Sequence, residues 1–148
     1  MRTIYLATLS LGLMALSAQA QNRIAVARVF GNPGEVRLFI AHSDGSGYQE
    51  LTSGTSNSSF PSFAPDGKRL VYREFDTDSY GLRILNLESR AISKLTDQYD
   101  NFPLWSPRGD LIMFARQIDK AYEIFTIRPD GSGLKQLTHT HGNDAHMA

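Results

Sequence analysis

Three histidines near the end of the sequence have a spacing that could hold a metal ion. His139, His141 and His146 form an H-x-H-x4-H pattern, and three imidazoles can ligate zinc. However, His139 and His141 flank a loop, and His146 falls in a segment expected to be a strand. The histidines are therefore a weak candidate for a metal site, and a polar loop is the favoured interpretation.

The residue types give little support to catalysis. The sequence has no cysteine, which excludes disulfides, thiol nucleophiles and thiolate metal sites. It also lacks a Gly-x-Ser-x-Gly motif, which presents the catalytic serine of many hydrolases. We therefore predict no catalytic residue, no cofactor and no enzymatic activity for this stretch of chain.

Two Gly-Ser-Gly runs, at 45–47 and 131–133, could suggest phosphate-binding loops. Such loops precede a helix, whereas these runs follow strand-like segments and have the composition of hairpin turns. Asp44, Asp66 and Asp130 occur at turns in the same way. We expect these carboxylates to accept hydrogen bonds from the turn backbone, because one acid in each repeat does not build a calcium site.

Polar residues precede several short strand-like segments and are the better candidates for binding. Their side chains suit hydrogen bonding to a peptide or a glycan, and equivalent placement would gather them around one mouth of a central channel; the alternative is a solvated loop. The candidates are Asn57, Ser58, Ser59, Asp100, Asn101, Asn143 and Asp144.

A repeat with a period of about 43 residues must position these loops. The run 61–67 (PSFAPDG) returns as 103–109 (PLWSPRG), and the pair Leu-Thr occurs at 51–52, 95–96 and 137–138. This period is typical of propeller blades. The glycine of each Pro-X-Gly turn is expected in the left-handed conformation.

The segments between the turns read as short strands. We expect strands at 23–30, 37–42, 48–52, 60–64, 68–75, 80–87, 91–96, 102–106, 110–117, 121–128 and 134–138, with almost no helix. The second strands, around 70–72 and 111–115, are apolar on both faces, which indicates a sheet stacked between two others. Phe63 and Trp105 occupy equivalent positions and are expected in the core between blades, although a stacking role facing the channel is conceivable.

The first twenty residues predict a secretory signal. Arg2 precedes an apolar run at 4–16, and 17–20 (SAQA) offers small residues for cleavage after Ala20. No later segment is long and apolar enough for a transmembrane helix. The 15 basic and 15 acidic residues balance, so nucleic acid is not an expected partner. We predict a periplasmic or secreted product.

The repeat units resemble the TolB-like, WD-type β-propeller family. The resemblance rests on 61–72 (PSFAPDGKRLVY), 105–107 (WSP) and 123–131 (EIFTIRPDG), and it covers nearly all of residues 23–148. It implies a six-bladed propeller and a protein-binding platform in the Tol–Pal system of the periplasm. Similar repeats also form the propellers of prolyl oligopeptidase and dipeptidyl peptidase enzymes and of some carbohydrate-active proteins.

We therefore predict an all-β chain, a signal at 1–20 followed by a partial propeller at 21–148. Its antiparallel blades of up to four strands fall near 23–52, 60–96 and 102–138, and another begins at 144–148. Closed propellers typically have four to eight blades, so further blades, or an oligomer, would close the ring. The expected function is a non-catalytic module for a protein or envelope partner. The alternative is the propeller fragment of a secreted hydrolase or carbohydrate-active protein.

Overall fold

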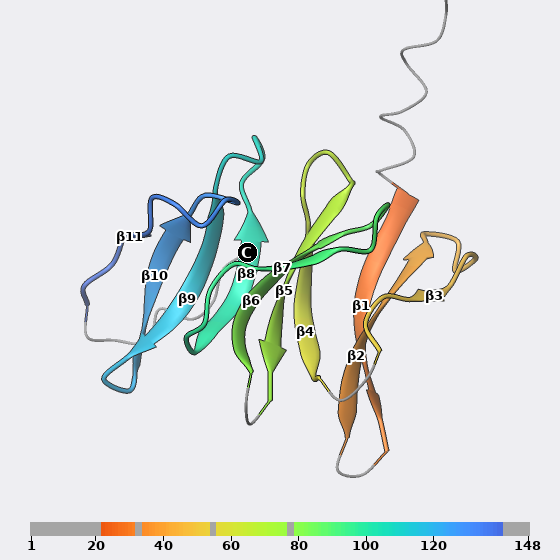
Figure 1. Ribbon diagram of the computed structural model, residues 1–148, viewed down its shortest axis with the longest axis horizontal. Helices are drawn as coiled ribbons and strands as arrows, with labels where there is room; N and C mark the ends of the chain where they lie inside the picture. Colours follow the sequence, from red (N-terminus) through yellow and green to blue (C-terminus); the bar gives the residue numbers. More distant parts are fainter. Residues whose placement is uncertain (1–21, 32–33, 54–55, 77–78, 141–148) are drawn as a thin grey trace, which may run out of the picture.

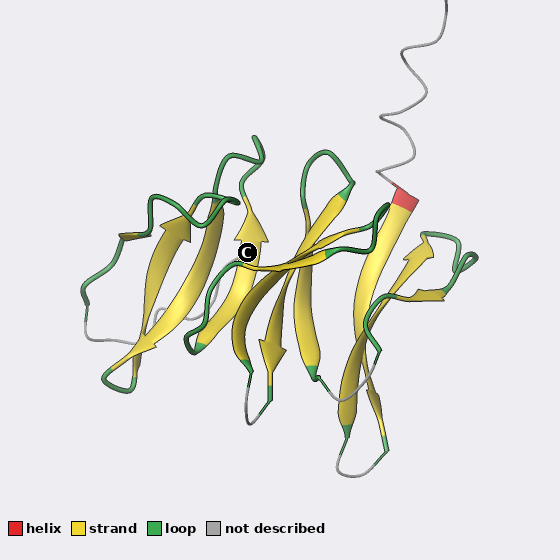
Figure 2. Cartoon of the chain, in the orientation of Figure 1, coloured by secondary structure: helices red, strands yellow, loops and turns green. Residues whose placement is uncertain are grey.

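The computed structural model describes residues 22–31, 34–53, 56–76 and 79–140, and these ranges form eleven strands in three sheets. The strands are β1 (Arg23–Phe30), β2 (Glu35–His42), β3 (Gln49–Glu50), β4 (Ser58–Phe63), β5 (Arg69–Phe75), β6 (Tyr80–Asn86), β7 (Ile92–Lys94), β8 (Asp100–Trp105), β9 (Ile112–Ile118), β10 (Ala121–Ile127) and β11 (Lys135–Gln136). Figure 2 shows strands and loops throughout this part of the chain, with one short helical segment at its start. The prediction of an all-β chain is confirmed.

Each sheet is an antiparallel meander, and the three sheets lie side by side as successive blades (Figure 1). The second and third blades have four strands each, in the orders β4-β5-β6-β7 and β8-β9-β10-β11. The first blade has the three strands β1-β2-β3 among the described residues. Strands β4 and β8, the first strands of their blades, contact each other. This is the arrangement of an open, partial propeller.

The Leu-Thr pairs close each blade with the same two hydrogen bonds. The Thr52 hydroxyl oxygen accepts a bond from the Leu38 N–H at 2.9 Å, and the Leu51 N–H donates to the Leu38 carbonyl at 2.8 Å. Thr96 repeats the first bond in the second blade, at 2.9 Å from the Leu82 nitrogen, and Thr138 repeats it in the third. The pairs found by spacing alone thus fasten the outer edge of each described blade to the neighbouring strand, which is β2, β6 or β10.

The seams between blades hold the hydrophobic core. The first seam joins Leu38, Ile40, Leu51, Leu70, Tyr72 and Leu85, and the second joins Ala64, Val71, Leu82, Ile84, Trp105, Ile112, Phe114, Phe125 and Ile127. Successive residues of β5 point to opposite seams, since Leu70 and Tyr72 contact the first and Val71 the second. The prediction that this strand is buried on both faces is confirmed. Burial also raises the pKa of Tyr72 to about 12.

Phe63 and Trp105 lie in successive seams, as the repeat predicts. Trp105 is 6% exposed inside the second cluster, whereas Phe63 is half-buried against the first. An arginine at the start of β1 or β5 covers each ring. The guanidinium carbon of Arg23 lies 5.6 Å from the Phe63 centroid, and that of Arg69 lies 4.8 Å from the Trp105 centroid. The equivalent aromatic residues Phe63 and Trp105 therefore pack between neighbouring blades.

The turns have the predicted chemistry. Gly67 and Gly109 adopt φ angles of 65° and 72° after their prolines. In the Gly-Ser-Gly turns, Asp44 accepts hydrogen bonds from the Ser46 hydroxyl and N–H, which hold the pKa of this carboxyl below its ordinary value. Asp66 accepts a bond from the Lys68 N–H at 2.8 Å. Asp130 likewise accepts a bond from the N–H of residue 132 at 2.9 Å. The interpretation of these residues as turn formers is confirmed.

Two predicted segments lie outside the described residues: the signal at 1–20 and the strand beginning at 144–148. Within the described ranges, no helix is long and apolar enough to cross a membrane.

Replacing Gly67 with valine should lower the free energy of unfolding by about 1–3 kcal/mol, because a β-branched residue resists the left-handed conformation. Urea unfolding followed by circular dichroism measures the loss. Gly67→Asn is the matched control and should lose less, because asparagine tolerates positive φ. Equal stability of the valine variant and the wild type would refute the turn assignment.

Replacing Trp105 with alanine should lower the free energy of unfolding by roughly 3–5 kcal/mol, because it removes a large side chain from the second seam. The same unfolding measurement applies, with Trp105→Phe as the control that keeps a ring in the seam. A loss below about 1 kcal/mol for the alanine variant would contradict a core role, since exposed positions tolerate substitution.

Candidate functional site

The predicted binding residue Asn57 joins neighbouring elements at one end of the blades. Its side-chain oxygen accepts a hydrogen bond from the Val36 N–H at 2.7 Å, and its amide nitrogen donates to Asp76 Oδ1 at 2.9 Å. The backbone N–H of Asn57 donates to the other oxygen of Asp76, also at 2.9 Å. These bonds connect the first blade to the β5–β6 turn. The half-buried side chain is thus already engaged within the fold.

Four other predicted residues belong to strands, which corrects their expected placement in loops. Strands β4 and β8 begin at Ser58 and Asp100, two residues earlier than expected. All four residues are buried: Ser58, Ser59, Asp100 and Asn101. Each of these strands contains a β-bulge, which shifts the pairing register after Ser59 in β4 and after Asn101 in β8. These residues are therefore covered positions within the strands.

Asp100 forms a buried ion pair that holds the start of β8 against β9. Its two carboxylate oxygens accept hydrogen bonds from Arg116 Nε at 2.7 Å and Nη2 at 2.9 Å. The guanidinium also lies over the rings of Phe114 and Phe125, at 5.3 and 5.1 Å from their centroids. Removing one partner of such a pair leaves an uncompensated buried charge. The geometry makes Asp100 a structural residue of the third blade.

Of the remaining predicted residues, His139 lies within the described part of the chain. His139 is exposed, and the part of the chain that the structure describes contains no group of three metal-ligating side chains. His141, Asn143, Asp144 and His146 lie outside the described residues.

The bulges bring together a pair of aromatic side chains that the sequence analysis did not select. Phe60 and Phe102 follow the buried polar residues of β4 and β8, and their ring centroids lie 4.5 Å apart. Both have positive φ angles, 53° and 51°. This conformation is an outlier for a bulky residue, and such strain clusters at functional sites. Phe60 is 41% exposed.

More exposed aromatic residues gather at the same end of the second and third blades. Tyr80 and Tyr99 lie with their ring centroids 6.1 Å apart, and each is more than 40% exposed. Arg73 lies over two rings, 4.6 Å from the Phe75 centroid and 4.9 Å from the Tyr99 centroid. The register places these residues together, because β5 ends and β6 begins at the Phe75–Tyr80 pair.

We call the set Phe60, Arg73, Phe75, Tyr80, Tyr99 and Phe102 the aromatic face. The signal for it in the sequence is an aromatic residue before the proline of each first strand, in 60–61 and 102–103. Protein interfaces are enriched in tyrosine, phenylalanine and arginine at their centres. Arginine stacked on aromatic rings is also partly ordered before any partner binds. The arrangement suits contact with another protein, and it has no evident nucleophile or acid–base pair.

Comparison with known proteins gives a family-level match. The model of the TolB beta propeller domain family matches residues 18–148. A protein TolB homolog of Chlorobium luteolum is 33% identical over 117 residues, which are 78% of this chain and 27% of that relative. The chain thus spans only about a quarter of the length of this relative.

Solved structures show the same fold. The putative TolB from Agrobacterium tumefaciens matches 80% of this chain and 43% of its own, with a TM-score of 0.73 at 21% identity. TolB from Acinetobacter baumannii matches 92% of this chain and 34% of its own, with a TM-score of 0.72 at 24% identity. Together with the repeats, the seams and the family match, these likenesses establish that the chain belongs to the TolB beta-propeller family.

Proposed function

We propose that this chain is an exported, non-catalytic binding module that holds a protein partner of the cell envelope on its aromatic face. The observation that carries the proposal is the cluster of the exposed Tyr80 and Tyr99 rings with the half-buried Arg73, whose guanidinium lies over Tyr99. Aromatic residues and arginine dominate the energetics of many protein interfaces. Membership of the TolB family supports a periplasmic partner.

The signal-like segment supports export as a part of the same proposal. We expect the exported product to begin at Gln21, because residues 17–20 present small side chains at the cleavage site. N-terminal sequencing of the protein recovered from the periplasm or the medium tests this. Replacing Ala20 with glutamate should leave the precursor uncleaved. A product that retains residues 1–20 in the wild type would contradict the signal assignment.

The aromatic face predicts which substitutions weaken partner binding. The peptidoglycan-associated lipoprotein encoded by the same genome is the partner to titrate, because the resemblance to TolB implies the Tol–Pal system. Tyr99→Ala should weaken binding of this partner to the full chain by about tenfold or more, as expected for a central interface tyrosine. Isothermal titration calorimetry measures the dissociation constant.

The matched control is Tyr48→Ala. Tyr48 is 50% exposed and stacks on Phe39 at 4.8 Å, but it precedes β3 at the opposite end of the blades. It should bind the partner like the wild type. Equal weakening by both substitutions, or no binding of the wild type, would contradict the proposed face. Labelling of the chain by a fluorophosphonate probe would contradict its non-catalytic character, since such probes react with activated serines.

A further inference from the structure

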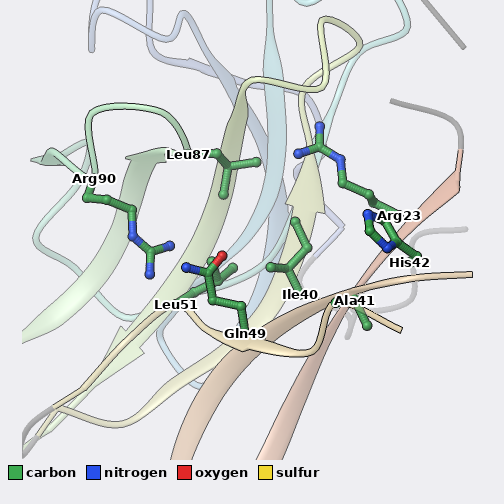
Figure 3. A pocket seen from close by; sticks show the side chains of 9 residues that line it. Arg23, Ile40, Ala41, His42, Gln49, Leu51, Leu87 and Arg90 are labelled. Carbon is green, nitrogen blue, oxygen red and sulfur yellow. The ribbon is translucent and has the colours of Figure 1, made fainter. Parts of the chain in front are cut away.

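A pocket that differs chemically from the aromatic face lies at the seam between the first and second blades. It has a volume of about 190 Å³ and is lined by Arg23, Ile40, Ala41, His42, Gly47, Gln49, Leu51, Leu87 and Arg90. Figure 3 shows Arg90 on one side of the pocket and Arg23 with His42 on the other, with Gln49 between them. Cationic and amide groups thus surround an aliphatic floor.

The two arginines cross the seam in opposite directions. Arg23 of the first blade donates from Nη2 to the Gly67 carbonyl of the second blade. Arg90 of the second blade donates from Nη2 to the Glu50 carbonyl of the first, at 2.8 Å. Each guanidinium is therefore held in place by a neutral backbone acceptor. Because a carbonyl carries no full charge, both positive charges stay uncompensated by these bonds.

The pocket offers further donors and no carboxylate. Arg23 Nε is buried and has no hydrogen-bond partner among the described residues, which is unusual for a buried polar atom. The Nδ1 atom of His42 lies 3.1 Å from the Ser46 hydroxyl oxygen. None of the nine lining residues is an aspartate or a glutamate. The lining therefore favours an anion.

The equivalent pocket at the next seam shows that the repeat itself does not require this charge. It is lined by Arg69, Ile84, Asn86, Ser89, Ala91, Ile92, Ser93 and Pro129, so that Arg69 and Asn86 take the places of Arg23 and His42. There the guanidinium pairs with the Asp66 carboxylate at 2.9 Å. Ser132 corresponds to Arg90 in the aligned repeats, so the second arginine is missing.

We propose that the pocket between Arg23 and Arg90 binds an organic oxyanion, a carboxylate or a phosphate monoester that carries a short aliphatic group. The guanidinium groups present charge-assisted donors to the anion. The aliphatic group contacts the side chains of Ile40, Leu51 and Leu87, which line the pocket. This site is separate from the aromatic face and does not depend on its function.

Isothermal titration of the full chain with sodium butyrate and with butyl phosphate, at constant ionic strength, tests the proposal. At least one of the two anions should bind with a one-to-one stoichiometry, and comparison of the two identifies the head group. Arg90→Gln should weaken that binding by about tenfold or more, the loss expected for charged hydrogen bonds. Arg90→Lys should lie between the two, because it keeps the charge and loses the planar donor pair.

Glutamine at residue 90 loses the hydrogen bond to the Glu50 carbonyl but adds no backbone strain. Residue 90 is exposed and has a φ of 62°, and glutamine keeps the same Cβ, so the backbone strain is unchanged. The matched control is Arg108→Gln, at an exposed turn arginine that pairs with Asp110, and it should bind like the wild type. The proposal is overturned if neither anion binds saturably, if Arg90→Gln binds as tightly as the wild type, or if Arg108→Gln weakens binding equally.

Discussion

Each blade depends on one residue whose backbone N–H and carbonyl both form hydrogen bonds with a Leu-Thr pair. In the first blade, the N–H of Leu38 donates to the Thr52 hydroxyl and its carbonyl accepts from the Leu51 N–H. The residue is fully buried, so leaving these groups unpaired would cost the desolvation of both. The same bonds occur in all three described blades. They strengthen the attachment of the outer strand, which has only two or three residues paired with its neighbour. The threonine hydroxyl thus supplies a hydrogen bond that a longer outer strand would supply from its backbone.

The hydrogen bonds of the Leu-Thr pair fix the neighbouring strand, and that strand contributes side chains to the seams. In the second blade, Leu82 both donates to Thr96 and packs in the second seam. On the other side of the same sheet, Leu85 packs in the first seam. A shift of one residue in register would exchange these two faces, turning Leu82 away from the second seam and Leu85 away from the first. The hydrogen bonds of the Leu-Thr pair and the packing of the apolar seams therefore favour the same register.

Local chemistry was sufficient to predict the turns, most strands and the seams. The Pro-X-Gly turns, the Leu-Thr spacing and the two-faced apolar strands each carry their structure within a few residues. The starts of β4 and β8 were misplaced because serine, asparagine and a following proline favour a loop by composition. Proline is tolerated there because each is an edge strand of its sheet and bulges at that point. The Asp100–Arg116 pair could not be predicted, since its partners are sixteen residues apart on different strands.

At the first seam, the positions that depart from the repeat are the two arginines of the proposed anion pocket. Asp66 neutralises Arg69 at the second seam, whereas Arg23 at the first seam has a backbone partner and Arg90 stands where the next repeat has Ser132. The second seam forms without either feature. An anion held between Arg23 and Arg90 would contact both blades at once, so its binding energy would add to the cohesion of that seam by mass action. Ligand binding in this pocket and blade packing would then be linked through the same two side chains.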